Sequence, residues 1–133
     1  MMAWSLRQPW AQLLATGKKT VETRTQYKSF RDEFLIHASK TFNHEDLVKF
    51  GYNQADLSFG AIIGKGNLTA VWQYRTKEEF ENDVHLHLVD EFYGPKVFGF
   101  LVKDAVKFET PIPCRGMLNF FRVGPEIERL LPK

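Results

Sequence analysis

The sequence predicts a small, mainly β protein of the α+β class, in which the strands form a closed or half-closed barrel with helices around it. Several apolar segments have the length and alternation of strands, and their lengths differ. The segment 60–72 carries Gly64 and Gly66 on one face, and glycines inside a strand are typical of a bulge or of the sharp bend at a barrel corner. The segments with helical spacing are short and lie between the strands.

The composition is that of an ordinary globular domain, and we expect residues 1–133 to form a single one. The chain has 133 residues, of which 44% are hydrophobic and 26% charged, and it contains no repeat or linker. No apolar run approaches the roughly 18 residues of a membrane span, so no membrane partner is expected. The first eight residues lack the apolar core of a signal peptide. Cys114 is the only cysteine, which indicates a cytoplasmic or otherwise intracellular location.

The segment 6–16 is predicted to contain a short helix. Pro9 suits the first helical position, where its missing N–H costs nothing. Trp10, Leu13 and Leu14 then have the spacing of one apolar helix face. Gly17 is expected to end the helix with a positive φ.

The segment 18–24 combines two lysines with a strand whose alternation is informative. Successive strand residues point to opposite faces, so Thr20, Glu22 and Arg24 share one face. Lys18 and Lys19 stand at its entrance. A hydroxyl, a carboxylate and a guanidinium on one rigid face can form a functional site. The same residues can also form an ordinary solvated face with a weak surface ion pair.

The remaining elements follow in order. A strand is expected at 34–40, with His37 and Ser39 on one face, and a helix capped by Asn43 ends at Gly51. The segment 60–72 is expected to be the longest strand, and its Gly-Lys-Gly lacks the spacing of a phosphate-binding loop. Thr76 and Glu79 form a capping box for the next helix.

The last third of the chain is predicted to contain two more strands and a final helix. His85 and His87 alternate, but no third ligand lies near them in sequence, so no metal or other cofactor is expected. A strand at 97–108 precedes an irregular segment marked by Pro111 and Pro113. A strand at 118–123 and a helix at 125–131 complete the chain.

The net charge of +2 is unevenly distributed. Residues 1–40 contain seven Lys or Arg and three Asp or Glu, whereas the remainder contains eleven basic and thirteen acidic residues. The basic surplus therefore lies around the segment 6–24, and such a surplus attracts polyanions.

Residues 5–24, Ser-Leu-Arg-Gln-Pro-Trp-Ala-Gln-Leu-Leu-Ala-Thr-Gly-Lys-Lys-Thr-Val-Glu-Thr-Arg, resemble the signature of the ASCH domain (activating signal cointegrator homology) in the PUA-like superfamily. Later pieces resemble it as well: 35–40, 60–64, Tyr93-Gly-Pro, Phe98-Gly-Phe and 111–116. The resemblance implies a PUA-like β-barrel with a cleft between the barrel and the first helix, where family members are proposed to bind RNA or another nucleic acid. It also implies two possible activities: one branch hydrolyses N4-acetylcytidine with a lysine and a threonine nucleophile, and another has been described as ribonuclease.

One departure from the amidohydrolase branch is important. That branch reads Lys-Thr-x-Thr-x-Arg, whereas this chain has Glu22 at the position of the nucleophilic threonine. A carboxylate does not replace an activated hydroxyl in acyl transfer. The hydroxyl of Thr20 would be displaced by about 6–7 Å at the usual rise of a strand.

Three hypotheses therefore remain open. The first is a nucleic-acid-binding module, for RNA rather than DNA, whose binding residues are Trp10, Lys18, Lys19, Thr20, Arg24, Ser39 and Lys40, with Trp10 either a core anchor or a stacking platform. The second is an enzyme acting on a modified nucleoside or a phosphodiester, with Lys19 and Glu22 as catalytic residues. The third is a protein-interaction domain with an exposed aromatic patch. The sequence does not predict the oligomeric state.

Overall fold

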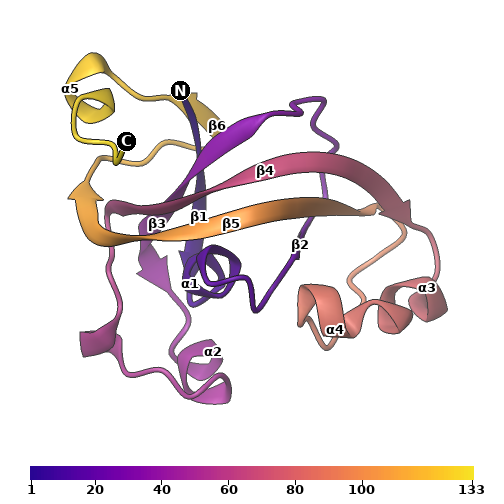
Figure 1. The fold of residues 1–133 in the computed structure, drawn as a ribbon. Helices are drawn as coiled ribbons and strands as arrows, with labels where there is room; N and C mark the ends of the chain where they lie inside the picture. Colours follow the sequence, from indigo (N-terminus) through magenta and orange to yellow (C-terminus); the bar gives the residue numbers. More distant parts are fainter.

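The computed structural model describes residues 1–133 and contains a curled six-stranded sheet in the order β2-β5-β4-β3-β1-β6 (Figure 1). Adjacent strands are antiparallel except β1 and β3, which run parallel. The mainly β half-barrel predicted from the sequence is thus confirmed. The strands are β1 (Met2–Gln8), β2 (Val21–Arg24), β3 (Glu33–Phe42), β4 (Ala61–Tyr74), β5 (Val97–Pro113) and β6 (Phe120–Arg122).

The helices are short, and only α1 packs inside the curl of the sheet (Figure 1). Ala11, Leu14 and Ala15 of α1 belong to the main core cluster, together with residues of β1, β3, β4 and β5. None of the helices is long and apolar enough to cross a membrane. The helices are α1 (Trp10–Ala15), α2 (His44–Lys49), the 3-10 turn η1 (Gln54–Asp56), α3 (Lys77–Asn82), α4 (Val84–His87) and α5 (Pro125–Glu128).

Strand β1 lies inside the sheet and was not predicted from the sequence. It pairs with β3 on one side and, through Met2–Trp4, with β6 on the other. Trp4 anchors the main core through aromatic contacts with Phe34, Phe100 and Phe120, at centroid distances of 5.8, 5.2 and 4.7 Å. Trp4, Leu6 and Gln8 form its buried face, whereas Ser5 is partly exposed and Arg7 exposed on the other. The strand is short, and its residues from 6 onward were assigned to the segment predicted to contain the first helix.

The two long strands form the bent part of the sheet. Their register shifts between Ile62 and Gly64 and at two later points, which confirms the bulges predicted from the glycines. The prediction that β4 is the longest strand was wrong, because β5 extends over 17 residues and continues through Pro111 and Pro113. At that end β5 has a neighbour on one side only, since β2 pairs with residues 98–101. The missing N–H groups of the prolines can therefore face an open edge.

Local signals place most helix ends correctly. Asn43 accepts hydrogen bonds from the N–H groups of Glu45 and Asp46, and Gly17 ends α1 with a φ of +77°. Two details were wrong. Pro9 precedes α1 as its N-cap, and Glu79 accepts from the N–H of Arg75 and not of Thr76. The segment with His85 and His87 forms the short helix α4. The last strand and the last helix are shorter than expected.

Candidate functional site

Edge strand β2 approaches β1 across the open side of the half-barrel, and side chains bridge the gap. We name this region the seam and define it by Ser5, Trp10, Lys19, Glu22 and Arg24. The Arg24 Nη2 atom donates to the carbonyl oxygen of Ser5 at 3.2 Å, and its Nε atom donates to Glu22 Oε2 at 2.9 Å. Lys19 Nζ lies 3.5 Å from the other carboxylate oxygen of Glu22. Both oxygens of Glu22 are therefore paired with cations.

Lys19 is buried beneath the seam, and 1% of its surface is exposed. After Gly17 the chain turns inward, and the N–H of Lys19 donates to the carbonyl oxygen of Leu13. Its ammonium donates to the carbonyl oxygen of His87 and lies 4.9 Å from the centroid of the Trp10 ring. Burial lowers the pKa of Lys19, and the neighbouring Glu22 carboxylate opposes that shift. In this position the ammonium is not available to a phosphate in solvent.

The seam opens into a cavity of about 480 Å³. Trp10, Glu22 and Arg24 line one side of it, and Ser39 and Thr41 of β3 line another. Trp10 is partly exposed, and its ring also makes an edge contact with Phe50 at 5.3 Å. The ring is therefore both anchored against the protein and open to the cavity.

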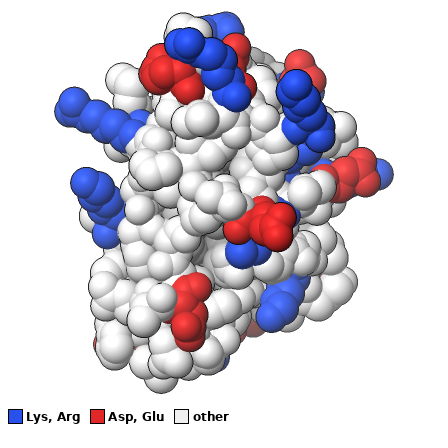
Figure 2. Space-filling view, turned by 60° about the vertical axis from the view of Figure 1, so that its left-hand side comes forward, with Lys and Arg blue, Asp and Glu red and all other residues white.

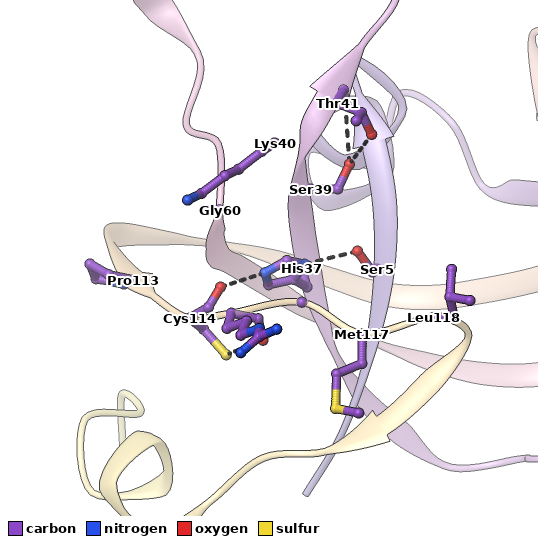
Figure 3. A pocket seen from close by; sticks show the side chains of 12 residues that line it. Ser5, His37, Ser39, Lys40, Thr41, Gly60, Pro113, Cys114, Met117 and Leu118 are labelled. Atoms are coloured by element: carbon purple, nitrogen blue, oxygen red, sulfur yellow. Dashed lines mark hydrogen bonds between the residues drawn. The ribbon is translucent and has the colours of Figure 1, made fainter.

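A second concavity, which we name the groove, has a volume of about 870 Å³ and lies between β1, β3 and the segment 113–118 (Figure 3). On its floor, Ser5 Oγ lies 3.0 Å from His37 Nδ1, and His37 Nε2 lies 2.7 Å from the carbonyl oxygen of Cys114. Two cationic side chains, Lys40 and Arg115, line the groove, and neither forms an ion pair within the protein.

The seam cavity and the groove are continuous. They share five lining residues, namely Ser5, Ser39, Thr41, Met117 and Leu118. Along the combined depression the cations are Arg7, Arg24, Lys40 and Arg115, and the only carboxylate is Glu22. A chain-like ligand can therefore pass from Trp10 to the far end of the groove without leaving the depression.

The structure brings together most, but not all, of the residues predicted from the sequence. Trp10, Glu22, Arg24 and Ser39 line the seam cavity, and Lys40 lines the groove. Lys18 is exposed outside both, with its ammonium 6.0 Å from the centroid of the Tyr52 ring. Thr20 also lines neither concavity, and its backbone bonds to residues 86 and 102.

Sequence reasoning missed the segment 114–118 and the side chain of Ser5. Arg115, Met117 and Leu118 contribute to the depression, although they lie about a hundred residues from the first helix in the chain. Ser5 lies in β1, the strand that was not predicted from the sequence. The only indication in the sequence that this segment contributes to the site was the family resemblance of residues 111–116.

On one face of the molecule, basic and acidic side chains are mixed and form no basic patch (Figure 2). On the face drawn in Figure 2, Lys and Arg side chains are separated by uncharged surface and alternate with Asp and Glu. No group of three or more His, Cys, Asp or Glu is arranged to hold a metal ion.

A curled half-barrel, a first helix inside the curl and a cleft beside that helix define the class as PUA-like. The sequence model of the ASCH domain matches residues 5–110, and this chain belongs to the ASCH domain family. The comparison with curated proteins gives no significant match.

Solved structures of the ASCH protein from Zymomonas mobilis have the same fold. The unsubstituted protein superposes with a TM-score of 0.69 at 18% identity, covering 96% of this chain and 90% of that one. Two single-substitution mutants of it give TM-scores of 0.69 and 0.68 at 17% and 18% identity, covering 97% of this chain and 92% and 94% of theirs. At this level of identity the likeness establishes the fold.

Proposed function

We propose that this ASCH domain binds single-stranded nucleic acid, RNA rather than DNA, along the seam cavity and the groove. The observation that carries the proposal is the continuity of the two concavities, which places Trp10 at one end and Lys40 and Arg115 at the other. Single strands are bound by combining a cationic groove for the backbone with aromatic side chains for the bases. The membership of a PUA-like family associated with nucleic acids supports this proposal.

The pairing of Glu22 favours binding over acid–base catalysis. A catalytic carboxylate needs an oxygen within reach of the substrate, whereas both oxygens of Glu22 are occupied by Lys19 and Arg24. Glu22 instead restrains Arg24, whose guanidinium also lies 4.9 Å from the Trp4 ring. Arg24 is thereby fixed at the wall of the cavity, where it can meet a phosphate with little loss of side-chain freedom.

One observation favours the second candidate, a hydrolase acting on a modified nucleoside such as acetylated cytidine. Lys19 is a buried amine with a lowered pKa, and lysines of this kind act as bases or nucleophiles. Its ammonium is, however, already bonded to the carbonyl oxygen of His87 and next to Glu22. Thr20, the hydroxyl nearest in sequence to the position of the nucleophile, does not line the cavity.

The proposal can be tested by fluorescence anisotropy. The labelled probes are a single-stranded RNA of twelve nucleotides, a DNA of the same sequence and an RNA duplex. We expect the single-stranded RNA to bind best, because the 2′-hydroxyl distinguishes RNA from DNA and a duplex cannot stack on Trp10. Trp10→Ala should weaken binding by about 5- to 150-fold, since a base–aromatic stack contributes about 1–3 kcal/mol. Trp72→Ala, in a partly exposed tryptophan of β4 outside both concavities, is the matched control.

Equal affinity of the wild type and the Trp10 variant for every probe would contradict the proposal. Turnover of acetylated cytidine separates the second candidate from the first. If Glu22 only restrains Arg24, Glu22→Gln should leave RNA affinity equal or higher, because a negative charge leaves the site of a polyanion. If Glu22 is an acid or base, the same variant should lose turnover by about 10²–10⁴-fold and keep its affinity.

A further inference from the structure

Ser5 and His37, on the floor of the groove, form a contact that nucleic-acid binding does not use. Ser5 Oγ is 3.0 Å from His37 Nδ1, and His37 Nε2 is 2.7 Å from the carbonyl oxygen of Cys114 (Figure 3). Ser5 belongs to β1, His37 to β3 and Cys114 to the segment after β5. Three parts of the chain that are far apart in sequence therefore meet in one line of hydrogen bonds.

The hydrogen-bond partners define the tautomer of His37. A carbonyl oxygen only accepts, so Nε2 must carry the proton that it donates to Cys114. In the neutral ring Nδ1 is then an acceptor, and the hydroxyl of Ser5 donates to it. A serine whose proton points at the free lone pair of an imidazole, with the imidazole oriented by a third group, is the arrangement of an activated nucleophile.

The imidazole is held rigidly and without a charged neighbour in contact. Its exposed fraction is 1%, Phe121 of β6 meets it edge-on at 5.6 Å, and a Cβ on Gly116 would come within 2.4 Å of Cε1. Ser5, Phe121, Gly116 and Cys114 surround it, and burial raises the pKa of the Cys114 thiol, which keeps it neutral. Burial also lowers the pKa of His37, so the ring is available as a base at neutral pH.

Ser39 in the same groove provides an internal comparison. Its hydroxyl lies 3.0 Å from Thr41 Oγ1 and donates to the carbonyl oxygen of Thr41, with no imidazole in reach (Figure 3). Ser5, by contrast, is partly exposed and lines both concavities while its proton is directed at a base. Both serines line the groove, but only Ser5 has a base in position to take its proton.

From this geometry we propose that the groove has a second, hydrolytic activity, in which Ser5 is the nucleophile and His37 the general base for carboxylic esters that carry a negatively charged group. Ser5 Oγ bonds to the ester carbonyl carbon as its proton moves to His37 Nδ1. The bond from that carbon to the alkoxy oxygen then breaks, and His37 returns the proton to the leaving alcohol. Water, deprotonated by His37, cleaves the acyl-serine and releases the acid with Ser5 restored.

The same groove supplies groups for the oxyanion and for the anionic part of the ester. The amide N–H groups of Arg115, Gly116, Met117 and Leu118 donate no hydrogen bond within the protein, so they are available to a developing oxyanion. Lys40 and Arg115 lack a carboxylate partner and can hold the negative group. Esters with a carboxylate or phosphate should therefore react better than neutral ones.

Labelling with a fluorophosphonate probe, read by intact and peptide mass spectrometry, tests the nucleophile directly. We expect the purified full chain to be labelled at Ser5 and the Ser5→Ala variant to remain unlabelled. Ser29→Ala, in an exposed serine of the connection after β2, should be labelled like the wild type. His37→Gln should slow labelling by about 10²–10⁴-fold, because the base is removed. Thermal unfolding of each variant confirms that it is folded.

Hydrolysis of 4-carboxyphenyl acetate, compared with phenyl acetate, tests the substrate class. We expect the anionic ester to be hydrolysed faster, and Lys40→Ala with Arg115→Ala to raise the KM for the anionic ester and so reduce its advantage in kcat/KM over the neutral one. The rate should stay constant on acidification until His37 is protonated, below the usual range for histidine. Labelling that persists in folded Ser5→Ala, or an unlabelled wild type, would overturn the proposal whatever the outcome for RNA binding.

Discussion

The seam and the groove are adjacent, yet they use their charges in opposite ways. In the seam, Lys19 and Arg24 are both paired with Glu22, at 3.5 and 2.9 Å, and Lys19 and Glu22 are buried. In the groove, Lys40 and Arg115 are exposed and have no acidic partner. The Lys19–Glu22–Arg24 cluster therefore holds β2 against the half-barrel and orients Arg24, whereas the unpaired cations along the depression, Arg7, Lys40 and Arg115, are open to a ligand.

The largest expected effect of a substitution is on stability, at Lys19. Lys19→Met leaves the Glu22 carboxylate buried with one partner instead of two, and breaking a buried pair costs about 3–5 kcal/mol of the free energy of unfolding. Urea denaturation measures the loss. Lys18→Met, one residue away and exposed, is the matched control and should change stability by less than about 0.5 kcal/mol.

The double variant Lys19→Met/Glu22→Gln sharpens this prediction. It should recover part of the stability lost in Lys19→Met, because the uncompensated charge is gone. Equal stability of Lys19→Met and Lys18→Met would show that the seam does not depend on its buried ion pair, and the contrast between seam and groove would fail.

A smaller loss of stability is expected in the segment 113–118, which we call the groove loop and which packs on His37 through Gly116. Gly116→Ala places a methyl group 2.4 Å from the imidazole, and overpacking of this kind costs about 1–3 kcal/mol. Thermal unfolding reports the loss. Met117→Ala is the control, because its side chain is exposed and its truncation should have little effect. A Gly116 variant as stable as the wild type would mean that the loop can move away from His37 at no cost.

The pH dependence of stability should reflect the protonation of two buried histidines, His37 and His87. Burial lowers the pKa of both His37 and His87 in the folded chain, so between those values and the unfolded value of 6.5 the unfolded chain binds more protons. The free energy of unfolding should therefore fall as the pH decreases below about 6.5. Protonation of His87 should contribute to this decrease, because its Nδ1 accepts a hydrogen bond from the N–H of Val89 and cannot do so when protonated.

Denaturant titrations between pH 5 and pH 7.5 measure this dependence. The His87→Gln variant should show a smaller decrease than the wild type over the same range. A wild-type stability that does not change over this range would contradict the lowered pKa values, and equal decreases in both proteins would assign the effect to groups other than His87.

The sequence predicted contacts that are local and failed for those that join distant segments. Strand alternation placed Glu22 and Arg24 on one face, and the structure pairs them at 2.9 Å. The sequence could not show that Lys18 is exposed and its neighbour Lys19 buried. The ammonium of Lys19 is held by a carbonyl group of α4, which lies 68 residues away in the chain. The half-barrel followed from strand pattern and glycines, whereas β1 did not, because it is short and its last residues were included in the segment predicted to contain the first helix.

The groove loop illustrates the same limit. Arg115 is one of many exposed basic residues in the sequence, and its proximity to Lys40 depends on where β5 ends relative to β3. Bulges in the β4–β5 ladder determine that position, and their number cannot be read from the glycines alone.

The most direct test of the account is the salt dependence of single-stranded RNA binding. The logarithm of affinity falls with the logarithm of salt concentration by about 0.7 for each phosphate that a cation neutralises. Lys40→Ala/Arg115→Ala should therefore lower that slope by about 1.4. The control variant Lys77→Ala/Lys103→Ala removes the same charge from exposed positions outside both concavities and should keep the wild-type slope. Equal slopes for the two double variants, in folded protein, would contradict the assignment of nucleic-acid binding to the groove.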